Sequence, residues 1–299
     1  MATHKHVFFG VYLVVLIGIA VIAIAAFRSP LSVARLGMSM GLVPTPTARA
    51  TPTPTPVPTP TPTPTPKPLT FAEMNALYGP CAVVPTLMYH HIQNLETAKA
   101  AGYGSLTVDT GIFQKQMQYL KDHGYNPMRP EQLIAFFDGT GGLPGKPVYL
   151  TFDDGYADFA SDAAPILRSF GFPATAFIPT GLLENPGYMS WGSLGDAASG
   201  GLIYMANHTW SHKSVTTSLS EDQREISTAD TQLSQHGYNA AKVFAYPYGT
   251  SSANGTTVLS QMGYKLGFTT NPGWTQCRAQ RFVLPRTRIG NAALSAYGL

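Results

Sequence analysis

The sequence is poor in charge and in cysteine, and both shortages narrow what the protein can be. Charged residues make up only 12% of its 299 residues, the formal net charge is +3, and no cluster of lysine and arginine stands out. A role in nucleic-acid binding is therefore not indicated, because such proteins neutralise phosphates with concentrated basic patches. The two cysteines, Cys81 and Cys277, lack the spacing of a zinc-ligand pair. Outside the cytoplasm they would either form a disulfide or remain separate thiols.

An apolar, uncharged run over residues 7–27 opens the chain. Its length of about 21 residues is close to what a helix needs to cross a bilayer. The apolar core of a cleaved signal peptide is usually shorter, about 7–15 residues. We therefore expect residues 1–28 to be a single-pass membrane anchor, with a cleaved signal segment as the alternative. Positive residues flank both ends of the run, so charge does not decide its orientation.

Threonine and proline alternate almost without interruption over residues 44–68. Alternating proline cannot build helices or sheet ladders, so this segment should be an extended, semi-rigid spacer. Tracts of this composition are also typical of O-glycosylated stalks. We predict a disordered Thr/Pro-rich linker over residues 29–68 and one globular domain over residues 69–299.

Short apolar runs alternate with helical patterns in the predicted domain. Helices are expected over 109–123, 163–170, 220–236 and 251–262, the third opening with a capping box from Ser220 to Gln223. The strands should be the nearly continuous apolar runs, namely 85–92, 147–152, 174–179, 202–206, 242–246, 265–269 and 282–289. Seven strands alternating with helices predict a parallel α/β fold, most simply a barrel.

Two polar motifs directly follow two of the predicted strands. Asp153 and Asp154 come after strand 147–152, and His208 and His212 come after strand 202–206. Barrels of this class build their active sites where the strands end, so these side chains should converge. Taken separately, Asp-Asp-Gly is usually a turn and two histidines are usually surface residues. Together they predict a metal-dependent hydrolase, because one carboxylate, two imidazoles and an open fourth position are typical of catalytic zinc.

Three motifs of the sequence resemble, in order, the first three motifs of the polysaccharide deacetylases, carbohydrate esterase family 4 with its NodB-like domain. They are YLTFDDG at 149–155, NHTWSH at 207–212 and FAYPYG at 244–249. The resemblance covers roughly residues 83–290. It implies a distorted (β/α)7-type barrel and the metal-dependent removal of acetyl groups from N-acetylated sugars.

Carried over by position, the resemblance implies that Asp154, His208 and His212 are metal ligands. Asp153 becomes the general base that activates a water molecule at the metal. The third motif would place the backbone N–H of Tyr248 near the developing oxyanion. Zinc suits this donor set best, although mixed nitrogen and oxygen sites also take cobalt, nickel or iron.

The sequence departs from the family pattern at several functional positions. Many members orient the catalytic base with an arginine, where this sequence has Ala245. Arg286, on the last predicted strand, is the candidate replacement, and Arg288 has the same parity along that strand and stays an alternative.

The family's C-terminal histidine, which serves as the general acid, is also missing, because no histidine follows His236. An acid is still needed to protonate the leaving amine. The segment LMYHHI at 87–92 looks like one in the subgroup that deacetylates poly-β-1,6-N-acetylglucosamine, which makes His90 the candidate. His91 should point to the opposite face of the strand, and the choice between the two histidines stays open.

These expectations combine into one functional hypothesis. The sequence predicts a membrane-anchored, extracytoplasmic deacetylase that acts on an N-acetylglucosamine-containing polysaccharide and releases acetate; cleavage at the N-terminus would make it secreted. The alternatives are an O-acetyl esterase on an acetylated polysaccharide and an inactive carbohydrate-binding module. Oligomeric state and glycan linkage do not follow from the sequence.

Overall fold

The computed structural model describes residues 67–299 of the chain. The predicted membrane segment at 7–27 and nearly all of the predicted linker lie outside these residues. Within residues 67–299, no helix combines the length and the apolar character that a membrane crossing requires.

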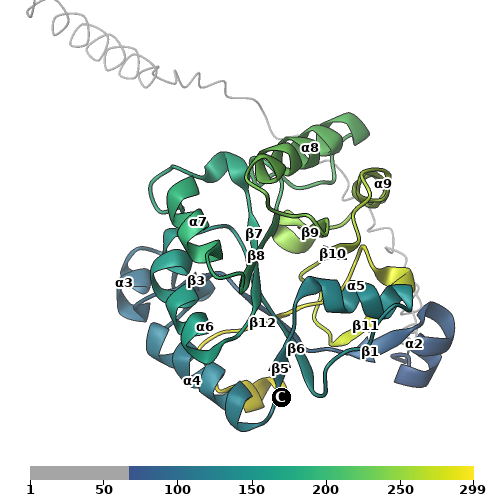
Figure 1. Ribbon diagram of the computed structural model, residues 1–299, viewed down its shortest axis with the longest axis horizontal. Helices are drawn as coiled ribbons and strands as arrows, with labels where there is room; N and C mark the ends of the chain where they lie inside the picture. Colours follow the sequence, from purple (N-terminus) through teal and green to yellow (C-terminus); the bar gives the residue numbers. More distant parts are fainter. Residues whose placement is uncertain (1–66) are drawn as a thin grey trace, which may run out of the picture. The chain divides into compact units, whose positions relative to one another are not determined.

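A curled parallel sheet forms the centre of the domain (Figure 1). Its strand order is β10-β9-β8-β7-β6-β2-β12, and β5 pairs with β6. The strand bounds are β2 Thr86–Tyr89, β5 Asn126–Pro127, β6 Pro147–Phe152, β7 Ala174–Ile178, β8 Ile203–Asn207, β9 Val243–Ala245, β10 Leu266–Phe268 and β12 Thr287–Arg288. Every residue of β7, β8, β9 and β10 is buried, as expected for strands covered on both faces. The arrangement is a parallel α/β fold that fits the predicted barrel class.

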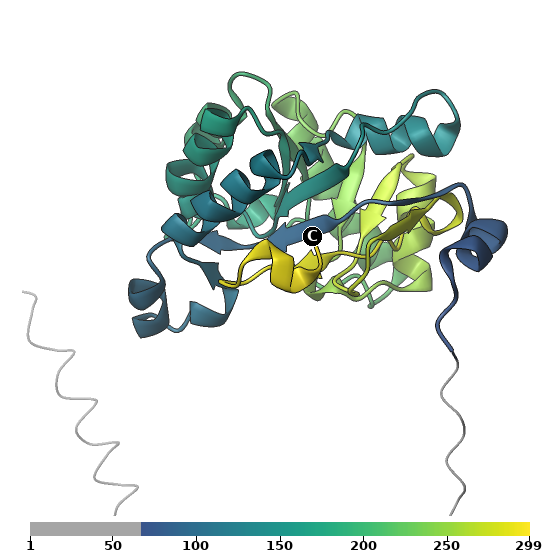
Figure 2. The same cartoon turned by 90° about the horizontal axis from the view of Figure 1, so that it is seen from below.

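Helices lie between the successive strands and cover the outside of the sheet (Figures 1 and 2). Their bounds are α2 Phe71–Tyr78, α3 Leu95–Ala100, α4 Thr110–Asp122, α5 Pro130–Asp138, α6 Ala164–Phe170, α7 Trp191–Ala198, α8 Leu219–Gln235 and α9 Ala253–Gln261. Helix α4 packs against α6, and α8 packs against α9. The predicted helices at 109–123 and 251–262 are confirmed as α4 and α9, whereas α5 and α7 were not predicted.

The predicted start of α8 was wrong by two residues. Ser218, not Ser220, caps the helix, and its side chain accepts a hydrogen bond from the backbone N–H of Glu221. Ser218 has an extended backbone, with φ −102° and ψ 156°, which directs its hydroxyl at the free N–H groups of the first turn. Ser220 already lies inside the helix.

Two predicted strands are broken or reduced to a small part of their apolar runs. Segment 85–92 breaks at His90, because β2 ends at Tyr89 and β3 (His91–Ile92) pairs with β4 (Thr107–Val108) in a separate ladder. Segment 282–289 keeps only Thr287–Arg288 as a strand. Pro285 has no N–H group to donate to a ladder, which explains why regular pairing is lost before β12.

Alternate side chains of the strands enter separate cores. Leu150 and Phe152 of β6 belong to the cluster under α4 and α6, whereas Tyr149 belongs to a second cluster on the other face of the sheet. In this second cluster the rings of Tyr149 and Phe177 pack against Phe268, with centroids 5.5 and 5.9 Å away. Aromatic side chains from β6, β7 and β10 thus fill the concave side of the curled sheet, beneath the strand ends that carry the polar motifs.

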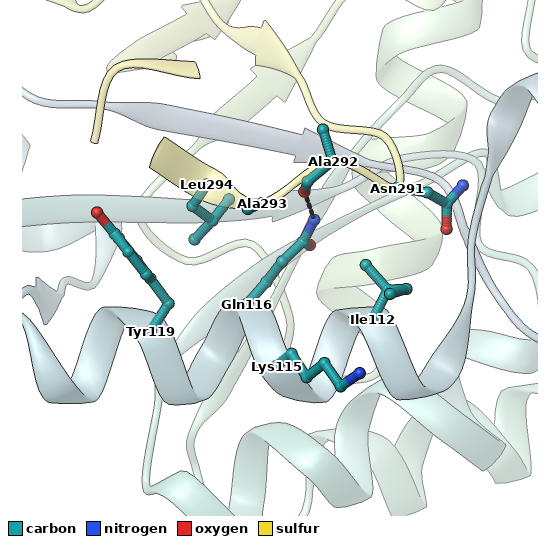
Figure 3. Close-up of a pocket in the computed structure, with 8 residues that line it drawn as sticks. All are labelled: Ile112, Lys115, Gln116, Tyr119, Asn291, Ala292, Ala293 and Leu294. Atoms are coloured by element: carbon teal, nitrogen blue, oxygen red, sulfur yellow. Dashed lines mark hydrogen bonds between the residues drawn. The ribbon is translucent and has the colours of Figure 1, made fainter. Parts of the chain in front are cut away.

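Two features tie the C-terminal part of the domain to its beginning. A disulfide joins Cys81 of β1 (Cys81–Val83) to Cys277 of β11 (Thr275–Cys277). The two cysteines are therefore bridged and are not separate thiols. The last residues cover α4 and lie beside the first strands (Figure 2). Gln116 of α4 donates hydrogen bonds of 2.9 Å to the carbonyls of Gly290 and Ala292, at a small apolar cavity of about 160 Å³ (Figure 3).

Candidate active site and metal centre

Asp154, His208 and His212 meet beyond the C-terminal ends of β6 and β8. Oδ1 of Asp154 lies 3.3 Å from Nε2 of His208 and 3.0 Å from Nε2 of His212. One candidate ligand atom from each of the three residues lies within 4.8 Å of the others. Across residues 67–299 this is the one group of three or more such side chains with that spacing. The convergence predicted from the strand ends is therefore present.

The donor set fits a divalent metal ion. Ligand bonds of about 2.0–2.2 Å would separate the donors of a tetrahedral site by roughly 3.3–3.6 Å, close to the two measured separations. Nδ1 of His208 donates to the backbone carbonyl of Ala245 at 2.7 Å, which leaves the lone pair of Nε2 directed at Asp154. Burial would raise the pKa of Asp154, but the neighbouring His208 and His212 hold it well below its usual range. The carboxylate is therefore ionised, as a metal ligand must be.

A buried network fixes the end of β8, from which His208 projects. The side-chain amide of Asn207 donates to the carbonyl of Ile226 at 2.9 Å and to the hydroxyl of Tyr264 at 2.6 Å. Its carbonyl oxygen accepts from the backbone N–H of Thr209 at 2.8 Å. With its amide oxygen and nitrogen both engaged, Asn207 sets the path of the loop that carries the two histidines.

Backbone strain collects at the same place. Asp154, His212 and Tyr248 have φ values of 74°, 58° and 60°, in the left-handed region that non-glycine residues rarely adopt. Such conformations cost on the order of 1–3 kcal/mol each and persist where the surroundings impose them. Strain at three residues around one cavity is the pattern expected of a functional site.

Asp153 lies beside the cluster and is held by Arg286. The pair is bidentate, with Nη1–Oδ1 and Nη2–Oδ2 distances of 2.7 Å, and Arg286 is fully buried. Arg286 also donates to the carbonyl of Thr269 and to the hydroxyl of Thr151. Burial opposes ionisation of Asp153, yet Arg286 and His208 lower its pKa below its usual value. Asp153 is therefore a buried carboxylate that carries its charge.

These side chains open into one cavity of about 300 Å³. Every residue predicted for the site lines this cavity except Arg286, which lies behind Asp153. The full lining is His90, Leu106, Asp153, Asp154, Tyr156, His208, His212, Tyr246, Tyr248, Thr270 and Arg288. The side chain of Arg288 forms no ion pair or hydrogen bond with any residue between 67 and 299. Arg286 is therefore the partner of Asp153, and Arg288 is a separate charge on the cavity wall.

The two histidines of the first predicted strand face different cavities. His90 lines the cavity of the metal cluster, and burial lowers its pKa, although Asp153 and Asp154 oppose this effect. His91 points away, with Nδ1 2.5 Å from Oδ2 of Asp158. The opposite directions predicted from strand geometry are confirmed.

Some wall residues were missed at the level of sequence. Tyr156 directly follows the aspartate motif at 149–155, so a search of that loop would have found it. Leu106 lies in the segment 91–108 that follows β2, called here the excursion 91–108, and no motif in the sequence marks it as a residue of the site. Tyr248, by contrast, was predicted, and its ring lies 4.8 Å from that of His212.

A family model described as "Polysaccharide deacetylase" matches residues 140–267. This range contains both aspartates, the two histidines of the metal cluster and Tyr248. The chain carries a polysaccharide deacetylase domain. A deacetylase of this kind is a hydrolase that removes acetyl groups.

Named relatives share this deacetylase domain. The chain is 27% identical over 220 residues to the Bacillus subtilis protein YxkH, which is provisionally named as a polysaccharide deacetylase. This match covers 73% of the chain and 75% of YxkH. It is 25% identical over 249 residues to the poly-β-1,6-N-acetyl-D-glucosamine N-deacetylase of Escherichia coli, covering 69% of this chain. The match spans 36% of the E. coli protein, about a third of its length.

The deacetylase domain also has a solved structural relative, the Streptococcus pyogenes deacetylase PplD in complex with acetate. That structure aligns with a TM-score of 0.64 at 29% identity, over 70% of this chain and 92% of PplD.

Proposed function

We propose that this domain hydrolyses N-acetyl groups of a polysaccharide that contains N-acetylglucosamine, with a divalent metal ion, zinc by preference, held by Asp154, His208 and His212. One observation carries the proposal. A three-donor cluster, an ionised carboxylate clamped by Arg286 and a buried histidine open into the same cavity. The relative from E. coli, named for poly-β-1,6-N-acetyl-D-glucosamine, supports N-acetylglucosamine as the sugar.

The side chains of the cavity divide the work of amide hydrolysis. When bound, a divalent cation supplies Lewis acidity, which polarises a carbonyl and acidifies water. Asp153, kept ionised by Arg286, accepts the proton of the water that attacks the acetyl carbon. The backbone N–H of Tyr248 shares the negative charge that develops on the carbonyl oxygen.

The second half of the reaction needs an acid, and we assign it to His90. As the C–N bond breaks, His90 gives a proton to the departing nitrogen, and acetate and a glucosamine residue result. His90 lines the cavity with Asp153 and the metal cluster, whereas His91 lies against Asp158 on the other side. The position of the two rings is what favours His90.

Acetate release by the metal-loaded protein tests the proposal on a panel of β-1,6-linked N-acetylglucosamine oligomers, chitin oligomers, peptidoglycan and acetylxylan. We expect release from the N-acetylglucosamine substrates, abolished by a chelator and by Asp153→Asn. Release from acetylxylan alone would instead identify an O-acetyl esterase. Binding of oligomers without any release would identify a carbohydrate-binding module.

We further propose the cellular context. Residues 1–28 anchor the protein in the membrane as a single-pass segment, and residues 29–68 space the catalytic domain away from it on the extracytoplasmic side. The apolar run at 7–27 and the Thr/Pro tract that follows support this arrangement. An envelope or matrix glycan is then within reach of the enzyme.

The fold admits a finer proposal as well. Leu284 bridges Phe268 at the end of β10, while β12 pairs with β2 at the other edge of the sheet. We propose that segment 284–288 in this way closes the sheet into the distorted seven-stranded barrel implied by the sequence.

A further inference from the structure

A second cavity of about 370 Å³ lies next to the catalytic cavity. It is lined by His91, Gln93, Thr97, Ala101, Tyr103, Ala157, Asp158, Ser161, Asp162 and Gly187. The wall between the two cavities is a pair of stacked rings. Tyr156 faces the catalytic cavity and His91 faces the second one, with centroids 3.6 Å apart and an interplanar angle of 17°.

The same two segments of the chain line both cavities. The excursion 91–108 contributes Leu106 to the catalytic cavity and Tyr103 to the second cavity. The segment 156–162 contributes Tyr156 to the first and Ser161 to the second. When the reacting sugar of a polymer occupies the catalytic cavity, a neighbouring sugar would therefore lie at the second cavity, against the same two segments of the chain.

The lining of the second cavity has the character of a sugar-binding site. Tyr103 is half exposed, and its ring centroid lies 5.3 Å from that of His91, which gives an aromatic surface for the apolar face of a pyranose. Gln93, Thr97 and Ser161 add polar groups for hydroxyls and an acetamide. No lysine or arginine lines the cavity, whereas two aspartates do, so an anionic sugar is disfavoured.

The position of His91 is itself fixed before any ligand binds. Asp158 accepts from Nδ1 of His91 at 2.5 Å and from the backbone N–H of Ile92 at 3.0 Å. Nε2 of His91 is buried and has no hydrogen-bond partner in the part of the chain that the structure covers. The wall between the cavities is thus held by the protein itself, which suits a surface that positions a neighbouring sugar.

We propose that this second cavity is a subsite for the sugar residue adjacent to the one being deacetylated, with Tyr103 as its stacking platform. The subsite rests on the proposed function, because it presumes that the ligand is an N-acetylglucosamine polymer. It makes the enzyme selective for chains over single sugars. The adjacent residue is neutral or a glucosamine, and not a uronic acid.

Two measurements on the full chain, loaded with zinc, test the subsite with Tyr103→Ala, Gln93→Ala and the control Phe71→Ala. Phe71 is an exposed aromatic residue of α2 that lines neither cavity. The first measurement is the ratio of kcat/KM for a β-1,6-linked N-acetylglucosamine pentamer to that for the single sugar. The second is calorimetric affinity for the fully deacetylated pentamer, which cannot turn over.

We expect Tyr103→Ala to lower both the kcat/KM ratio and the pentamer affinity roughly five- to tenfold, as loss of one stacking contact predicts. Gln93→Ala should lower both to a smaller extent, and Phe71→Ala should change neither.

Values for Tyr103→Ala equal to those of the unaltered protein would overturn the subsite while leaving the proposed function standing. If the protein bound the acetylated pentamer without releasing acetate, the proposed function would be wrong. The calorimetric affinities of the variants for the deacetylated pentamer would then still test the subsite. An unaltered protein that neither binds nor cleaves the glycans would overturn both.

Discussion

At the scale of single residues, the decisive contact is the one between Asp153 and Arg286. Both side chains are buried, and the two 2.7 Å contacts between them form a bidentate ion pair. Such a pair is geometrically specific, because the planar guanidinium matches both carboxylate oxygens at once. It keeps the proposed base charged and fixes the direction of its oxygens.

The first prediction concerns the stability of this pair. Arg286→Met should lower the free energy of unfolding by about 3–5 kcal/mol, because a buried carboxylate is left without its partner. Adding Asp153→Asn to that variant should restore part of the loss, since the uncompensated charge is then removed. Urea unfolding of the two single variants and the double variant measures this coupling. Additive losses would show that the two side chains do not depend on each other.

The second prediction distinguishes the acid. His90→Gln should reduce kcat for acetate release by about 10²–10⁴-fold, the usual contribution of a positioned acid or base. His123→Gln is the matched control, because His123 is an exposed histidine at the end of α4 and outside both cavities. Turnover by His90→Gln at the level of that control would assign the acid to another residue.

At the scale of elements, the domain depends on a clamp between distant parts of the chain. Strands β1 and β11 pair antiparallel with Cys81 opposite Cys277, and the disulfide between them spans 196 positions of sequence. Closing so long a loop restricts the unfolded chain strongly. Neither cysteine lines the catalytic cavity, so the clamp acts on stability rather than on chemistry.

The third prediction follows from this clamp. The variant with both Cys81→Ala and Cys277→Ala should be about 2–5 kcal/mol less stable, yet should keep its kcat at temperatures where it remains folded. Reductant should destabilise the unaltered protein by a similar amount and leave the double variant unchanged. Thermal unfolding with and without reductant provides the comparison. Equal sensitivity of the two proteins to reductant would contradict a structural disulfide.

At the scale of the whole molecule, metal binding and folding are linked. The cluster draws Asp154 from the end of β6 and its two histidines from the loop after β8, so only the folded chain presents all three donors. A ligand that binds only the folded state stabilises it by mass action.

The fourth prediction uses that linkage. At free zinc 100 times above its dissociation constant, the folded state should gain about 2.7 kcal/mol, and a chelator should remove both this gain and acetate release. His212→Ala should abolish the gain, because one of the three donors is lost. Thermal unfolding of the two proteins with zinc and with chelator measures it. A zinc effect of equal size in His212→Ala would place the metal elsewhere.

The fifth prediction concerns the proposed anchor. In cells, the full chain should sediment with membranes and resist extraction by high salt, because an apolar helix is held by the bilayer and not by charge. A chain that begins at residue 29 should leave the membrane fraction. Fractionation of the two forms distinguishes an anchor from a cleaved segment. If the segment were cleaved, the protein expressed from the full sequence would also be absent from the membrane fraction.

Agreement between the predicted and observed fold is best where local pattern and burial coincide. Strands β6, β7 and β8 are continuous apolar runs buried on both faces, and their predicted bounds match the observed ones to within one residue at each end. Helix α8 shows the opposite case. The sequence indicated Ser220 as its cap, whereas Ser218 has the extended backbone that a capping residue needs.

By itself, the sequence determined which side chains can share a metal. Asp154, His208 and His212 lie in short motifs directly after strands, and parallel strands bring their carboxyl ends to one edge. The tertiary structure alone decided which arginine reaches Asp153. Residues 286 and 288 have the same parity, but Arg286 passes over the buried ring of Phe177, 5.3 Å away, whereas Arg288 stays on the cavity wall. The disulfide between Cys81 and Cys277, and which of His90 and His91 faces the metal cluster, were settled in the same way. Each depends on contacts between segments far apart in the chain, which no local pattern of residues encodes.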